Sequence, residues 1–326
     1  MNAGPQMVRW SVIGQSVRGA SHKRSGAPNQ DAIRRRYDRL GIPPIVLAVS
    51  DGHGSPKCFR SDRGARFAAD IACQLTSQFL RKMGDSAPAI VKRETEARLP
   101  VGIVNAWRKK VDEDIRKNPF TEEELERVKL YVGASARTAL EQGDPQQKAL
   151  AYGATLLLTA AGQDYAFYLQ LGDGNILTVW DHTPQPQVDA PLPEDATLLA
   201  NDTTSLCMPN AHRLFRFRFQ YFQGAPPAVI ILSTDGYANS FSSMDDFFKV
   251  GSDLLQILRA EKQSKGKENK LKQRMALEKN LNDWLEDASI NGSGDDVTVG
   301  IIYRQDVIGS ENQHSAPSTH SAGAAI

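Results

Sequence analysis

Five aspartates stand at the ends of apolar runs in this sequence. Asp51, Asp173 and Asp235 each follow such a run and precede a glycine, and Asp31 and Asp295 come shortly before one. The end of one antiparallel strand adjoins the start of the next, so all five side chains could share one edge of the fold. Clustered carboxylates raise one another's pKa unless a cation compensates their charge. The pattern therefore predicts a site for hard, oxygen-preferring ions such as Mg²⁺ and Mn²⁺.

Such a site suits phosphoryl chemistry. Two ions about 3.5–4 Å apart can bridge a water, lower its pKa and stabilise a phosphoryl transition state. Two other interpretations of the Asp-Gly turns are disfavoured. A haloacid-dehalogenase-type phosphatase needs a second Asp two residues after its nucleophile, where this chain has His53, Asn175 and Tyr237. An EF-hand is excluded because Asn175 is followed by Ile176 and Leu177, which cannot bind calcium.

The composition is that of an ordinary globular protein. With 326 residues, of which 40% are hydrophobic and 24% charged, the chain can form one large domain or two modest ones. Its 39 basic and 38 acidic residues give a formal charge of +1, which argues against nucleic acid or a membrane as partner. Cys58, Cys73 and Cys207 form no CxxC pair, as expected of buried thiols in a reducing compartment. Without a visible signal peptide or membrane-spanning run, we expect a cytoplasmic protein.

Hydrophobic periodicity predicts strands, then helices, then several strands, helices and a last strand. Alternating or short apolar runs indicate strands near 8–12, 45–50, 154–160, 165–171, 176–180, 215–219, 228–232 and 297–303. Apolar residues four apart predict helices over 67–79 and 103–115, and a capping box at Thr121 opens a helix expected to reach Ala139. The Gly- and Ser-rich segment 14–26 is expected to be a loop.

This order of elements favours an α+β fold. Strands and helices do not alternate one for one, so mostly antiparallel sheets covered by helices fit better than a doubly wound parallel sheet. Residues 1–305 are expected to form one domain, and 306–326 a disordered tail with little to bury. Residues 181–211, rich in Pro, Asp and Thr, predict a long surface excursion, and loops of that length are often functional.

Six stretches, in order along the chain, resemble the metal-dependent type 2C (PPM-type) serine/threonine protein phosphatases. They are Asn29-Gln30-Asp31-Ala32, Val49-Ser50-Asp51-Gly52-His53-Gly54, Gly153-Ala154-Thr155, Leu171-Gly172-Asp173-Gly174, Ser233-Thr234-Asp235-Gly236 and Gly294-Asp295-Asp296-Val297-Thr298-Val299. Each is weak alone, but their order and spacing are specific, and the match spans about residues 11–303. The short loops are more similar to prokaryotic members. The resemblance implies a central β-sandwich of two antiparallel sheets flanked by helices on both sides, with residues 1–305 as the catalytic domain.

The resemblance also implies a mechanism. Phosphoserine and phosphothreonine in proteins would be hydrolysed by a water that bridges two Mg²⁺ or Mn²⁺ ions, without a phosphoenzyme. Asp51 would bridge both ions, and the carbonyl of Gly52 would bind one. The remaining ligands, some acting through water, would be Asp31, Asp235 and Asp295. Asp173, with Asp235, matches the position associated with a third, weaker ion.

Other matched positions concern protons and the substrate phosphate. His53 matches the residue proposed to protonate the leaving oxygen, and the alternative is a hydrogen-bonding role beside the metals. Gln30 stands where many members have Glu, and Gly26 where many have the Arg that grips the phosphate. Asp296, where Asn is frequent, is either close to the metals or merely exposed. Cations on the same loop could replace the missing Arg, namely Arg18, Lys23 or Arg24.

Two functions from different classes remain open. The first is a metal-dependent phosphatase acting on a phosphorylated protein, such as a Ser/Thr kinase or its target, or on an anti-sigma-antagonist-type partner. The second is a catalytically silent module that binds a phosphoprotein or a kinase. Retention of all five acidic positions favours the enzyme, because a binding module has no need of a repulsive cluster. Segment 181–211 corresponds to a variable flap that we expect to shape substrate choice.

Overall fold

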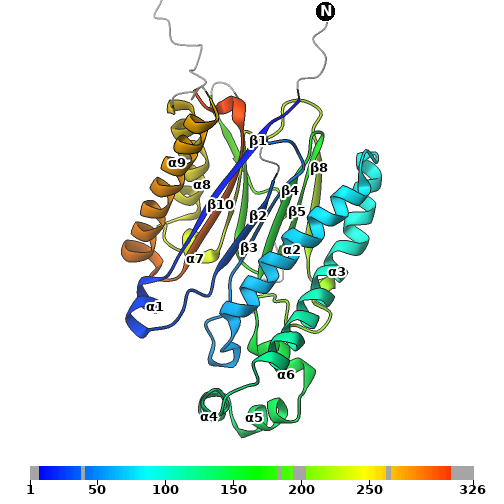
Figure 1. The fold of residues 1–326 in the computed structure, drawn as a ribbon. Helices are drawn as coiled ribbons and strands as arrows, with labels where there is room; N and C mark the ends of the chain where they lie inside the picture. Colours follow the sequence, from blue (N-terminus) through cyan, green and yellow to red (C-terminus); the bar gives the residue numbers. More distant parts are fainter. Residues whose placement is uncertain (1–6, 38–40, 183–184, 194–202, 262–265, 310–326) are drawn as a thin grey trace, which may run out of the picture.

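Two five-stranded antiparallel sheets stack face to face, with helices on both outer faces (Figure 1). The computed structural model describes residues 7–37, 41–182, 185–193, 203–261 and 266–309. One sheet has the order β1-β10-β9-β6-β7, formed by Trp10–Val17, Val297–Arg304, Val229–Ser233, Asn175–Trp180 and Gln187–Asp189. The other has the order β2-β3-β4-β5-β8, formed by Ala32–Arg36, Ile45–Ser50, Leu156–Ala161, Tyr165–Leu171 and Arg216–Tyr221. The predicted α+β sandwich is confirmed.

The strands are buried on both faces because each sheet lies between its partner sheet and a layer of helices. In β3, Ile45, Leu47 and Val49 pack in the cluster between the two sheets. The alternate residues Val46 and Ala48 pack in the cluster under the helices of the outer face. This alternation is the period of two that a strand imposes on its side chains. It explains why the whole strand reads as an apolar run.

Two pairs of long helices cover the sandwich (Figure 1). α2 (Ser61–Met83) packs on α3 (Pro88–Lys117) and on β2, β3 and β4. On the opposite face, α9 (Lys267–Ala288) packs on β1 and α8 (Met244–Ala260) packs on β6. Shorter helices lie at the end of the sandwich where β3 terminates, namely α1 (Ala20–Ser25), α4 (Glu122–Tyr131), α5 (Ala134–Glu141), α6 (Pro145–Ala151) and α7 (Asp235–Ala238).

Two local expectations differ from the structure. The capping box at Thr121 is present, since Thr121 Oγ1 accepts a hydrogen bond from the N–H of Glu124 at 3.2 Å. The helix that it opens ends at Tyr131 rather than reaching Ala139, because Gly133 has a φ of 127° and interrupts the chain between α4 and α5. The prediction of a loop over 14–26 is wrong for most of the segment. Strand β1 continues to Val17, and the helix α1 follows, which Gly26 ends in the left-handed conformation.

The described chain continues beyond the expected domain end at residue 305. Gln305–Val307 forms a 3₁₀ turn, and Val307 is 1% exposed, packed in the cluster under α8 and α9. The rest of the predicted tail, 310–326, lies outside the described residues. Cys58, Cys73 and Cys207 are buried free thiols, as expected.

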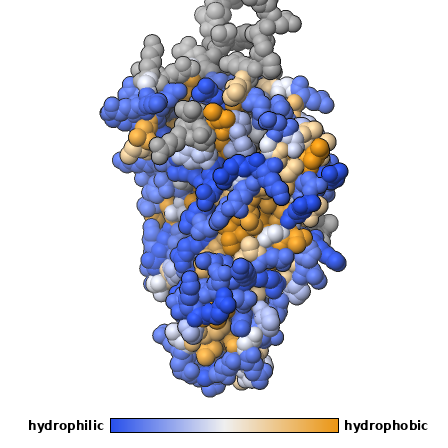
Figure 2. All heavy atoms as spheres, turned by 45° about the vertical axis from the view of Figure 1, so that its right-hand side comes forward, coloured by the Kyte–Doolittle hydropathy of each residue, from blue (hydrophilic) through white to orange (hydrophobic). Residues whose placement is uncertain are grey.

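The outer surface is mostly polar. Figure 2 shows the side that carries α3, where hydrophobic residues appear between larger hydrophilic areas. Among the described helices, none combines the length and the apolar character needed to cross a membrane.

Candidate active site

Strand register brings the five aspartates to one end of the sandwich. The first residue of β2 pairs with the last residue of β3, so Asp31 and Asp51 lie side by side. The last residue of β9 pairs with the first residue of β6 and the third residue of β10, so Asp235 lies at the same end as Asp173 and Asp295. The two sheets meet there through Asp31, whose Oδ2 accepts a hydrogen bond of 2.8 Å from the hydroxyl of Thr234.

The backbone around Asp51 is fixed from two sides. Thr155 donates its N–H to the carbonyl of Asp51 at 2.8 Å, and its hydroxyl oxygen accepts the N–H of Asp51 at 3.0 Å. The next residue, Gly52, lies so close to α2 that a Cβ would stand 2.6 Å from the carbonyl oxygen of Ser61. Only glycine fits this position without moving the backbone. The turn therefore holds the Asp51 carboxyl at the strand end with little freedom.

Burial and mutual repulsion raise the pKa of the central carboxyl groups. Burial raises the pKa of Asp31 to about 8, although hydrogen bonds from Thr298 and Thr234 oppose the rise. Burial likewise raises the pKa of Asp51 well above its ordinary value, and the neighbouring charges of Asp31 and Asp235 raise it further. The carboxyl groups of Asp51 and Asp235 are close enough to share a hydrogen bond. Carboxyl groups this close are costly to ionise unless a cation lies among them.

A cleft of about 610 Å³ opens over this cluster. Four of the five aspartates line it, namely Asp51, Asp173, Asp235 and Asp295. Asp31 is 7% exposed and does not line the cleft. The described end of the predicted flap also reaches the cleft: Thr203, Ser205, Cys207 and Met208 line it. Thr203 donates its hydroxyl to Asp173 Oδ2 at 2.6 Å, so the flap and one aspartate are in direct contact. The flap residues 183–184 and 194–202 lie outside the described chain.

His53 lies on the wall of the same cleft. The backbone N–H of His53 donates a hydrogen bond to the carbonyl of Gly153 at 3.1 Å. A Cβ added to Gly153 would lie only 2.8 Å from the His53 imidazole. Burial lowers the pKa of His53, and the negative charge of Asp173 partly opposes this. The imidazole is therefore within reach of the acidic cluster and is held in one place by close packing.

The three cations expected to grip the phosphate do not line the cleft. Arg18 donates a 2.7 Å hydrogen bond to the carbonyl of His22. Lys23 lies 4.0 Å from Glu286, and Arg24 is exposed on α1. Among the described residues that line the cleft, Lys57 is the one lysine or arginine, and it is close enough to His53 to affect the charge of that imidazole. The sequence offered a signal for Lys57, because it follows His53 by only four residues.

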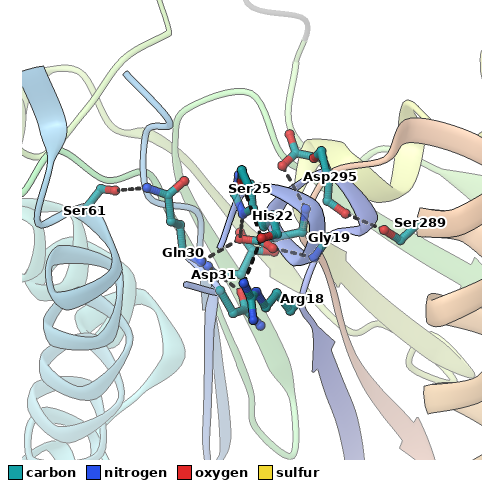
Figure 3. Close-up of polar contacts among 12 residues, drawn as sticks. Arg18, Gly19, His22, Ser25, Gln30, Asp31, Ser61, Ser289 and Asp295 are labelled. Atoms are coloured by element: carbon teal, nitrogen blue, oxygen red, sulfur yellow. Dashed lines mark hydrogen bonds and ion pairs between the residues drawn. The ribbon is translucent and has the colours of Figure 1, made fainter. Parts of the chain in front are cut away.

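Asp296 has a role that the sequence left open. Its side chain is 3% exposed and accepts hydrogen bonds of 2.6 Å from the backbone N–H groups of Gly19 and Gln30. Figure 3 shows these two donor residues together with His22. His22 Nδ1 lies 2.9 Å from Asp296 Oδ2, so the imidazole is a third hydrogen-bond partner of this carboxylate. Asp296 is therefore a buried anchor between α1, the residue before Asp31 and the start of β10. His22 carries only a weak signal in the sequence, namely its place in a short segment between Gly19 and Gly26.

Comparison with known proteins identifies the family. A family model described as protein phosphatase 2C matches residues 18–286. A mutant of a bacterial serine phosphatase superposes with a TM-score of 0.51 at 13% identity, covering 92% of this chain and 98% of that chain. The unmutated bacterial serine phosphatase gives 0.50 at 13% identity with the same coverage. The catalytic domain of the serine/threonine protein phosphatase PstP, solved with 2 manganese ions, gives 0.49 at 15% identity, covering 91% and 99%.

A search of curated proteins found no significant match to this sequence. The family match is nonetheless decisive, because it spans most of the chain and includes four of the five aspartates. The solved structures support the same fold at low sequence identity. The chain belongs to the protein phosphatase 2C family, and it is a serine/threonine protein phosphatase of the PPM type.

Proposed function

We propose that this protein hydrolyses phosphoserine and phosphothreonine in proteins with the help of Mg²⁺ or Mn²⁺ bound by the aspartate cluster. The observation that carries the proposal is the convergence of four aspartates on one cleft, namely Asp51, Asp173, Asp235 and Asp295, with Asp31 buried beside them. Carboxyl groups held this close are costly to ionise without a cation. The hydrogen bonds between Thr155 and Asp51 and the close packing at Gly52 nevertheless hold the Asp51 carboxyl group in this cluster, as a metal site requires.

The donor set fits hard divalent ions. The carboxylates of Asp31, Asp51, Asp235 and Asp295 and the carbonyl of Gly52 offer oxygen ligands, which Mg²⁺ and Mn²⁺ prefer. Two ions would be held by this set, and Asp173 is the candidate ligand of a third. When bound, such ions supply an activated water and neutralise the charge of the phosphoryl group.

The protein's own residues would complete the reaction. His53 lies on the cleft wall and is proposed to donate a proton to the leaving serine or threonine oxygen. Lys57 is proposed to attract the substrate phosphate, since it lines the cleft while Arg18, Lys23 and Arg24 do not. The flap residue Thr203 touches Asp173 and could couple peptide binding to the site.

The proposed substrate is a phosphoprotein, such as a Ser/Thr kinase or its target. The proposed compartment is the cytoplasm, where free buried thiols such as Cys58 and Cys73 remain reduced. The second candidate, a silent phosphoprotein-binding module, is disfavoured because such a module has no need of the five retained aspartates.

Hydrolysis of a phosphothreonine peptide tests the proposal. Activity is expected with Mn²⁺, with near-complete loss after chelation and in Asp51→Ala. Activity that survived chelation and the substitution would exclude the metal mechanism. Metal binding by calorimetry without turnover of several phosphopeptides would favour the silent module.

A further inference from the structure

We propose that the cleft contains an apolar subsite that selects an apolar substrate side chain two positions away from the phosphorylated residue. Four residues that line the cleft form this subsite, namely Cys58, Leu150, Cys207 and Met208. The inference rests on the proposed hydrolysis of phosphoproteins, and it adds a sequence preference of the substrate to that function. Leu150 and Met208 would be the residues that determine this preference.

The subsite lies directly beside His53, and Gly153 shows how close the side chains are. A Cβ added to Gly153 would lie 2.8 Å from Cδ2 of the His53 imidazole, 3.1 Å from Sγ of Cys58 and 3.3 Å from Sγ of Cys207. Each thiol is therefore no farther from the imidazole carbon than the sum of two such distances. His53 is the proposed proton donor to the leaving oxygen, so the peptide that carries this oxygen passes the subsite.

The side chains of the subsite offer no charge to a substrate. Burial raises the pKa of the Cys58 thiol to about 12 and also raises that of Cys207, so both thiols are neutral at physiological pH. Neutral thiols behave as small apolar groups, and that of Cys207 already donates to Oγ of Ser205 at 3.2 Å. Leu150 and Met208 are half-buried and present apolar surface to the cleft. A charged substrate side chain would lose water here without gaining a partner.

Hydrogen bonds from two helices hold the flap side of the subsite. On α3, Nη2 of Arg108 donates to the carbonyls of Cys207 at 3.2 Å and Met208 at 2.8 Å. On α6, which packs against α3 (Figure 1), Nε2 of Gln146 donates to the carbonyl of Cys207 at 2.8 Å. Leu150 lies four residues after Gln146 and therefore on the same face of α6. The subsite is thus formed before a substrate binds.

The geometry of an extended peptide determines which substrate residue reaches the subsite. Side chains two residues apart in an extended chain point to the same side and lie about 6.5 Å apart. A phosphothreonine that directs its phosphate into the cleft therefore directs the side chains two positions before and after it toward the cleft as well. The side chains one position away point to the opposite side. We expect the apolar preference at one of the two positions that face the cleft.

Phosphothreonine peptides that differ at a single position test this preference with the full-length protein and Mn²⁺. The variable position lies one or two residues before or after the phosphothreonine and carries Leu, Ala, Glu or Lys. We expect Leu to exceed Ala by about 10-fold in kcat/KM at a position two residues away, as for a side chain that enters an apolar pocket. Glu and Lys should fall below Ala there. The positions one residue away should show no such order and serve as the internal control.

Met208→Lys tests whether the subsite causes the preference. At the responsive position, the ratio of kcat/KM for the Leu peptide to that for the Glu peptide should fall by about 10-fold or more, because the apolar contact is replaced by a cation. The ratio compares two substrates of one variant, so a general loss of activity does not affect it. Met275→Lys adds the same charge at a residue that is 60% exposed on α9 and does not line the cleft. This matched control should keep the ratio of the wild type.

The remaining outcomes contradict the inference. Equal kcat/KM for Leu and Ala at both positions two residues away would overturn it and leave the proposed function intact. A preference of the wild type for Glu there would also overturn it, and would assign the contact to Lys57. A preference for Leu that Met208→Lys left unaltered would place the selection outside this subsite. Absence of turnover for every peptide would overturn the proposed function, and this inference with it.

Discussion

At the scale of single residues, the site consists of groups whose charge state depends on what else is bound. Burial raises the pKa of Asp31 and Asp51, and burial lowers that of His53. Burial and the neighbouring charges of Asp31 and Asp235 favour the protonated form of Asp51 when no cation lies beside it. Ion binding would displace those protons, so metal affinity should rise with pH.

Replacement of His53 by Gln separates acid catalysis from metal binding. Hydrolysis of a phosphothreonine peptide should slow by about 100-fold, because its alkoxide leaving group needs a proton. Hydrolysis of p-nitrophenyl phosphate should change far less, because its phenolate leaves without one. Steady-state kinetics on both substrates measure the difference. Equal losses on both would assign His53 to metal or substrate positioning instead.

Lys57 is expected to act on substrate binding. Lys57→Ala should raise KM for a phosphopeptide about 5–10-fold, as expected for loss of roughly 1 kcal/mol from a partly exposed charge pair. Lys92→Ala, which removes an exposed lysine from α3 away from the cleft, should leave KM unchanged and serves as the matched control. An unaltered KM in Lys57→Ala would return the phosphate-binding role to Arg18, Lys23 or Arg24.

At the scale of elements, close backbone packing holds the site in register. Near the start of α2, a Cβ on Gly64 would stand 1.8 Å from the carbonyl oxygen of Tyr152, which lies next to the Gly153-Ala154-Thr155 turn. Trp107 of α3 donates its indole N–H to the carbonyl of Gly64 at 3.0 Å. One glycine thus sets the distance between two helices and the segment that supports Asp51.

A pair of glycine substitutions tests this packing. Gly64→Ala should destabilise the protein by about 3 kcal/mol or more, because a backbone oxygen must move. Gly102→Ala lies inside α3 with no atom within 4 Å of the added Cβ, and should stabilise by roughly 0.5–1 kcal/mol. Chemical denaturation measures both. A similar effect of the two changes would mean that the close approach at Gly64 is readily relaxed.

Helices and strands are easiest to predict from the sequence where the hydrophobic pattern is uniform along the whole element. The buried runs at 45–50 and 297–303 could be recognised as strands because both faces are apolar. Asp51-Gly52 marked the end of the first run, and Gly294-Asp295 the turn before the second. The break at Gly133 and the helix α1 could not be recognised. Gly133 interrupts a helical pattern that continues on both sides, and α1 has no buried residue to give it a period. The function of Asp296 depends on three distant partners, which no local pattern contains.

At the scale of the whole molecule, the two sheets supply the proposed metal ligands from both sides of one site, so metal binding and folding would be coupled. Asp31 and Asp51 come from one sheet, whereas Asp235 and Asp295 adjoin strands of the other. An ion held by both groups would join the sheets at this end. It would stabilise the folded state in proportion to its free concentration.

The raised pKa of Asp31 predicts that the metal-free protein becomes less stable as pH rises. The pKa of Asp31 is about 8 in the folded state against an ordinary value of 3.8, so the folded protein retains a proton that the unfolded chain releases. The contribution of Asp31 is fully present below pH 3.8 and is lost as pH rises toward 8. Thermal unfolding in chelator should therefore show a Tm lower at pH 8 than at pH 5, by at least about 5 °C.

Two comparisons control this experiment. Asp31→Asn carries no titrating group at that position, so its Tm should vary less over the same pH range. Added Mn²⁺ should raise the Tm of the wild type most at pH 8, where protons compete least. A Tm of the metal-free wild type that rose between pH 5 and pH 8 would contradict the raised pKa.

Asp51 is proposed to make this phosphatase dependent on divalent ions. The most direct test is the rate of phosphothreonine-peptide hydrolysis as a function of free Mn²⁺, for the wild type and for Asp51→Asn. The wild type should be inactive in chelator and saturate with Mn²⁺, and Asp51→Asn should lose at least about 100-fold in kcat/KM. Metal-independent activity in the wild type, or full activity in Asp51→Asn at saturating Mn²⁺, would contradict the account.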